Sequence, residues 1–125
     1  MVASSIFSAT ALAADQPVVI GDVAMPEVNS SEAFRQVEKK VGKWEGKMTQ
    51  GLTGKVIDVA YEWRVTSGGN TITETLVEDG VEMLTTYSDK NGELIVRHYC
   101  ALGTEPVFKV RDVSNESLEL ELDEA

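Results

Sequence analysis

Residues 55–65 carry an apolar or aromatic side chain at every second position from Ile57 onward, and this period of two is the strongest structural signal in the chain. Side chains of a strand point in turn to its two faces, so a period of two predicts a strand with one buried face. One face of the segment carries Ile57, Val59, Tyr61, Trp63 and Val65. We therefore expect a half-buried strand here, with its aromatic side chains turned toward the interior.

Six other segments after Gly42 also have the character of strands, separated by short turns. Asp79-Gly80 and Asn91-Gly92 are typical of tight two-residue hairpins, because these residues tolerate positive φ angles. The seven predicted strands cover residues 43–50, 55–65, 71–78, 81–88, 93–102, 107–113 and 117–125. A mostly β fold follows, an antiparallel up-and-down meander that closes into a barrel or folds into a sandwich.

One short helix is predicted before the meander, at residues 29–41. Asn29 is a good N-cap, and Glu32 three residues later completes a capping box. Gly42 is expected to end the helix. Its apolar stripe is formed by Phe34, Val37 and Val41. A stripe this narrow covers part of a larger structure rather than forming a core by itself.

The first 28 residues show no clear period and divide into two parts. Residues 1–13 are apolar, rich in small side chains, and end in the Ala-Leu-Ala pattern that signal peptidase accepts. Because no basic residue precedes Arg35, we expect a truncated signal peptide and export to the periplasm or the outside. The alternative is an apolar N-terminal tail. Residues 14–28 contain two prolines and are predicted to be a linker or arm.

Composition narrows the classes of function. The formal net charge is −10 and the basic residues form no cluster, which argues against nucleic acid as a partner. No stretch reaches the roughly 20 apolar residues of a membrane span, so no stable membrane insertion is expected. The sequence has no phosphate-binding glycine loop, zinc-protease motif or nucleophile elbow, and it predicts no cofactor and no metal. It does not indicate an oligomeric state.

The residues at the start of the meander resemble those of a known protein superfamily. A helix followed by Gly42-Lys43-Trp44 at the start of the first strand resembles the calycin superfamily, the lipocalins and fatty-acid-binding proteins. Residues 71–83 and 98–106 make the chain similar to bacterial lipocalin-like proteins of the domain-of-unknown-function 1579 type. The resemblance implies a calycin-like β-barrel in which Trp44 plugs one end. Such barrels have about eight to ten strands, so we expect the domain at residues 29–125 to be an incomplete barrel, cut short at the C-terminus.

His98 and Cys100 are the only histidine and the only cysteine, and they lie two residues apart on the more apolar face of one predicted strand. The thiol is free or forms an intermolecular disulfide. Several interpretations stay open: a hydrogen-bonded core histidine beside a buried thiol, a pair lining a ligand-binding lumen, a zinc site joined by Glu74, or a Cys–His nucleophile. The predicted lumen residues are Tyr61, Trp63, Glu74, Met83, Tyr87, His98 and Cys100.

Glu74 lies between the apolar residues Ile72 and Leu76. If it faces inward, it must be protonated or paired, and His98 is the obvious partner. The opposite register, with Glu74 in water, is also open.

The predicted function is a non-enzymatic carrier or sensor that binds a small, mostly apolar molecule in the barrel lumen. One alternative is an enzyme that uses Glu74 and His98 as an acid–base pair. Another is a secreted structural domain with a packed interior.

Overall fold

A seven-stranded antiparallel sheet forms most of the structure, a computed structural model that describes residues 19–124. The predicted signal peptide at residues 1–13 lies outside this range. Each strand of the sheet pairs with the next one in the sequence, which confirms the predicted up-and-down meander. The strands are β3 (Gly42–Thr49), β4 (Val56–Thr66), β5 (Thr71–Glu78), β6 (Val81–Lys90), β7 (Glu93–Tyr99), β8 (Val107–Val113) and β9 (Leu118–Leu122).

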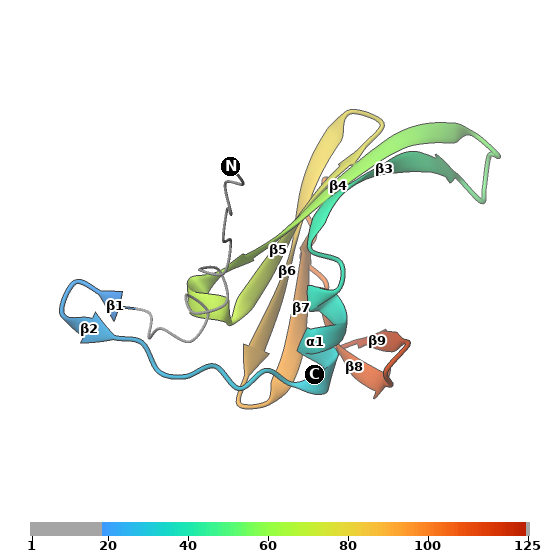
Figure 1. The fold of residues 1–125 in the computed structure, drawn as a ribbon. Helices are drawn as coiled ribbons and strands as arrows, with labels where there is room; N and C mark the ends of the chain where they lie inside the picture. Colours follow the sequence, from blue (N-terminus) through green and yellow to red (C-terminus); the bar gives the residue numbers. More distant parts are fainter. Residues whose placement is uncertain (1–18, 125) are drawn as a thin grey trace, which may run out of the picture.

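The sheet curls into a half-barrel (Figure 1). Its two edges are β3 and β9, which do not pair with each other, so the barrel is open. The mostly β class and the antiparallel meander are therefore confirmed, and the half-barrel is consistent with the predicted incomplete calycin-like barrel. We call the side of the sheet that packs against the helix the inner face, and the opposite side the outer face.

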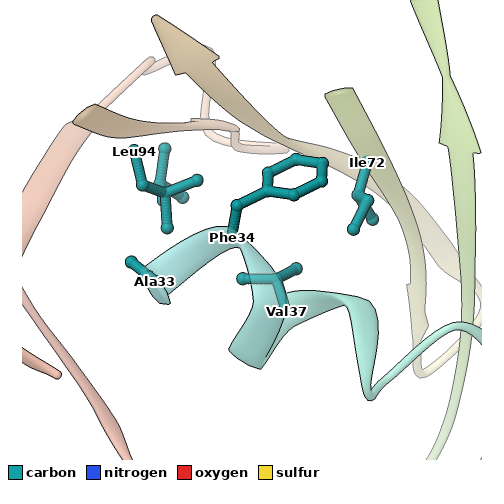
Figure 2. Close-up of a cluster of buried hydrophobic side chains, with 6 residues drawn as sticks. Ala33, Phe34, Val37, Ile72 and Leu94 are labelled. Carbon is teal, nitrogen blue, oxygen red and sulfur yellow. The ribbon is translucent and has the colours of Figure 1, made fainter. Parts of the chain in front are cut away.

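Helix α1 (Glu32–Glu38) packs on the inner face of the half-barrel, across β6, β7 and β8. Phe34 is 1% exposed, and its ring lies between Leu94 and Ile72 (Figure 2). The core formed in this way contains Ala33, Phe34, Val37, Ile72, Leu94 and Val96. Complete burial of an aromatic or branched aliphatic side chain stabilises the fold by about 1.5–3 kcal/mol, so these few contacts hold the helix to the sheet.

The start of the helix differs from the prediction. Ser31, not Asn29, is the N-cap, and its hydroxyl oxygen accepts a hydrogen bond from the backbone N–H of Phe34 at 3.1 Å. Asp89 of β6 selects this position, because its carboxylate accepts bonds from the Ser31 backbone N–H at 2.6 Å and the Ser31 hydroxyl at 2.7 Å. A carboxylate beside a helix N-terminus is also favourable for the helix dipole.

The end of the helix also differs from the prediction. The last helical residue is Glu38 and the C-cap is Lys39, so Gly42 begins β3 and does not end the helix. Val41 therefore lies beyond the helix and is 45% exposed. The apolar stripe that reaches the sheet consists of Phe34 and Val37, joined by Ala33.

The two predicted hairpin turns are confirmed. Asp79 and Gly80 have φ angles of 51° and 80°, and Asn91 and Gly92 have φ angles of 53° and 80°. Positive φ at both central residues is the geometry whose twist matches the flanking strands. These turns fix the register of β5 on β6 and of β6 on β7.

Strand β7 ends at Tyr99, earlier than predicted, because the chain turns at Cys100. The Cys100 N–H donates to the Thr104 carbonyl at 3.0 Å, and the Gly103 N–H donates to the Cys100 carbonyl at 3.0 Å. At the other end of the chain, the predicted arm contains a small hairpin that the sequence pattern did not predict. Its strands, β1 (Val19–Ile20) and β2 (Val23–Ala24), are exposed and lie away from the sheet (Figure 1).

Phe34→Ala should lower the free energy of unfolding by about 3–5 kcal/mol, because it leaves a cavity between the helix and the sheet. Val41→Ala is the matched control and should cost under about 0.5 kcal/mol, since Val41 is largely exposed. Guanidinium unfolding followed by far-ultraviolet circular dichroism measures both. Equal losses in the two variants would contradict the packing described above.

Candidate functional site

A row of four side chains crosses the inner face from β4 to β7. Directly opposite residues of antiparallel strands point to the same face. Trp63 lies opposite Glu74, Glu74 opposite Thr85, and Thr85 opposite His98. The alternative register, with Glu74 in water, is therefore excluded: its side chain is only 6% exposed.

The remaining predicted lumen residues flank this row on the same face. Tyr61 and Met83 lie on one side of it, both opposite Leu76 of β5. Tyr87 lies on the other side, between Ile72 and Val96. Cys100, a free thiol, follows His98 just beyond the end of β7 and is partly exposed. The meander thus places side chains from four strands on one surface.

Hydrogen bonds connect the polar members of the site. The Tyr87 hydroxyl donates to Glu74 Oε1 at 2.9 Å. Thr85 Oγ1 lies 2.9 Å from His98 Nδ1, and the Thr85 hydroxyl also hydrogen-bonds to the Glu74 carboxyl. The partners of Glu74 are therefore Tyr87 and Thr85, and the expected partner His98 is held by Thr85 instead.

Burial dominates the electrostatics of the site. Loss of hydration raises the pKa of Glu74 above its usual value, and the nearby charge of Glu78 raises it further. Hydrogen bonds from Tyr87 and Thr85 act in the opposite direction but do not cancel the effect of burial. The pKa of Tyr87 is also raised, first by burial and then by the charge of Glu74.

Aromatic rings form one wall of the site. The ring centroids of Trp63 and Tyr87 are 5.0 Å apart, with a tilt of 33°. This separation and tilt lie within the range of favourable aromatic pairs, worth about 0.5–1.5 kcal/mol beyond area burial. The pKa of Tyr61 is raised by burial, by the charge of Glu78 and by the charge of Glu74, which places its hydroxyl in the same negative environment.

Thr85 is the member of the site that the sequence analysis missed. It is 5% exposed and lies between Glu74 and His98 in the row. The signal was present, because a strand that turns Met83 and Tyr87 inward must also turn Thr85 inward.

Trp44 does not plug an end of this half-barrel. It lies on the edge strand β3 and is 51% exposed. Its indole N–H donates to the Lys40 carbonyl at 2.7 Å, so it ties the first strand to the residues just after the helix.

The exposure of the site residues decides which of them a bound molecule could touch. Glu74 and Thr85 are covered by their neighbours, whereas the predicted lumen residues other than Glu74 are partly exposed. Tyr61 and Met83 also border two open hollows of about 220 and 340 Å³, but most residues that line these hollows lie on the outer face, so neither hollow belongs to the inner-face site. A molecule on the inner face would contact aromatic rings, a thioether and an imidazole before it reached the carboxyl.

Residues 19–124 contain no group of three or more His, Cys, Asp or Glu side chains placed to hold a metal ion. Within the same range, no helix is long and apolar enough to cross a membrane. Comparison with protein-family models, curated proteins and solved structures found no match to this chain. The similarity to lipocalin-like proteins remains a prediction.

The raised pKa of Glu74 predicts a specific pH dependence of stability. A carboxyl that holds its proton more tightly in the folded state stabilises the fold fully below its unfolded pKa of 4.5. This contribution is lost as the pH rises through the higher folded-state pKa. Glu74→Gln removes the titration and keeps an acceptor for the Tyr87 hydroxyl.

We therefore expect the urea midpoint of the wild type to fall more than that of Glu74→Gln between about pH 4 and pH 7. Glu119→Gln, at an exposed position on the outer face, removes the same charge and should follow the wild type. Parallel pH profiles for the wild type and Glu74→Gln would show that Glu74 titrates as it does in water.

Proposed function

We propose that this protein binds a small, mostly apolar molecule on the inner face of its half-barrel and acts as a carrier or sensor without chemistry of its own. The observation that carries the proposal is the convergence of the predicted lumen residues on one concave face. Their partly exposed surface is mainly aromatic and apolar, with a few polar groups, as is typical of small-molecule sites.

The surroundings of the site agree with this function. Helix α1 fills the inner face near Ile72, Leu94 and Val96, and the row through Glu74 lies beside this packed region. Aromatic side chains next to the core offer contact area at a low cost in conformational entropy. We place this binding in the periplasm or outside the cell, as the signal-peptide-like residues 1–13 predict.

The acid–base alternative receives less support from the geometry. Glu74 and His98 have Thr85 between them in the row, and the Glu74 carboxyl accepts the Tyr87 hydroxyl. Direct proton transfer needs donor and acceptor within about 2.6–3.2 Å or joined by one water. We therefore retain binding as the single proposed function.

Nile red, a neutral apolar dye that brightens in apolar surroundings, tests the proposal. We expect it to bind the wild type, and we expect Met83→Glu to weaken binding about tenfold or more, because the new charge would lose hydration beside the dye. Leu84→Glu is the matched control, since Leu84 is the next residue on β6 and is exposed on the outer face. It should leave the affinity unchanged.

Titration of the dye into each variant gives the dissociation constants, and circular dichroism checks that each variant is folded. Equal affinities for the two variants would show that the dye binds somewhere other than the inner face. No binding to any variant would overturn the proposed function. Native mass spectrometry of the protein purified from its own host would then reveal the mass of the natural ligand.

A further inference from the structure

Charged side chains divide unequally between the two faces of the sheet. The strands carry six lysines and arginines whose register places them on the outer face: Lys43, Lys47, Arg64, Lys90, Arg97 and Lys109. Arg111, at the β-bulge of β8, is exposed. The inner face of the described strands therefore presents no lysine or arginine from a regular strand position.

Acidic side chains do occur on the inner face. Asp89 is one of them, and the helix N-cap at Ser31 uses both of its carboxylate oxygens. Glu74 and Glu78 are the other two, on β5, opposite Trp63 and Val59 of β4. Their charges act on the site, since they raise the pKa of Tyr61. When ionised, Glu74 and Glu78 place negative charge beside the site, and the net charge of −10 has the same sign.

Aromatic rings surround Glu74. Trp63 is its direct neighbour across the strand pair, and Tyr61 and Tyr87 are its diagonal neighbours on β4 and β6. The faces of such rings carry partial negative charge and attract cations, by about 0.5–2 kcal/mol for each favourable contact. The Glu74 carboxyl hydrogen-bonds to Tyr87 and Thr85, and an ionised carboxylate offers about four acceptor positions, so it can accept a further hydrogen bond.

We propose that the ligand of the inner face is an organic ammonium ion, with its nitrogen against the partly exposed rings of Tyr61, Trp63 and Tyr87, close to the buried carboxyl of Glu74, and its apolar body over Met83. This inference rests on the proposed function and specifies its ligand class. A fatty carboxylate would meet Glu74 and Glu78 with no strand lysine or arginine to receive it. A cation beside Glu74 would also favour the ionised carboxylate and so compensate for the cost of its burial.

Three probes with the same apolar group and different charge test the ligand class: 2-phenylethylamine, 2-phenylethanol and 3-phenylpropionate. We expect isothermal titration calorimetry at pH 7 and low salt to show the amine binding at least about tenfold tighter than the alcohol, a difference of about 1.4 kcal/mol. The carboxylate should bind more weakly than the alcohol. Nile red titrated into the same preparations reports binding of an apolar molecule independently of charge.

Variants separate a local effect from the overall charge. Glu74→Gln should reduce amine affinity about tenfold, to that of the alcohol. Glu119→Gln removes an equal charge from the outer face and should keep the preference for the amine. Equal loss in both variants would overturn the inference, because the attraction would then come from the net charge.

The remaining outcomes distinguish the inference from the function on which it rests. If the alcohol or the carboxylate binds as tightly as the amine, the ammonium class is wrong and the proposed function stands. If Nile red binds and none of the three probes does, the ammonium class is again overturned. If neither Nile red nor any probe binds, the proposed function fails and the inference fails with it.

Discussion

The structure depends on the packing of one helix into the concave side of an open sheet. A seven-stranded meander with an apolar face needs a cover for that face, and its two edges, β3 and β9, do not close over it. Helix α1 supplies the cover by inserting Phe34 against Ile72 and Leu94. It spans only seven residues, so it covers one part of the face and leaves the row through Glu74 beside it. The proposed binding site is thus the part of the inner face that helix α1 leaves uncovered.

Burying the polar side chains of the row through Glu74 costs free energy of folding. Burial of Glu74 removes hydration from a carboxyl, and the hydrogen bonds of Tyr87 and Thr85 offset that cost only in part. Buried polar groups that weaken a core often belong to sites that recognise something else. The placement of Glu74 among three aromatic rings is consistent with such a role.

Local patterns predicted the fold well, and contacts between distant segments account for most of the differences. β5 and β8 have the predicted bounds because period-two alternation and positive-φ turns are properties of neighbouring residues. The helix start was misplaced because Asp89, 58 residues away in the sequence, holds Ser31 as the N-cap. The inner-face residues were predicted from alternation, whereas the bonding partner of Glu74 depends on which strands become neighbours. Only the register shows that Thr85 separates it from His98.

The turn at Cys100 has a practical consequence. This residue is the only cysteine of the chain, it is partly exposed, and it follows the strand that carries His98 by a single residue. A thiol-reactive fluorophore would therefore attach at one defined position at the rim of the inner face. No second sulfhydryl would compete for the reagent, and no engineered attachment point would be needed. The protein thus carries its own labelling position, from which the arrival and departure of a molecule could be followed in real time.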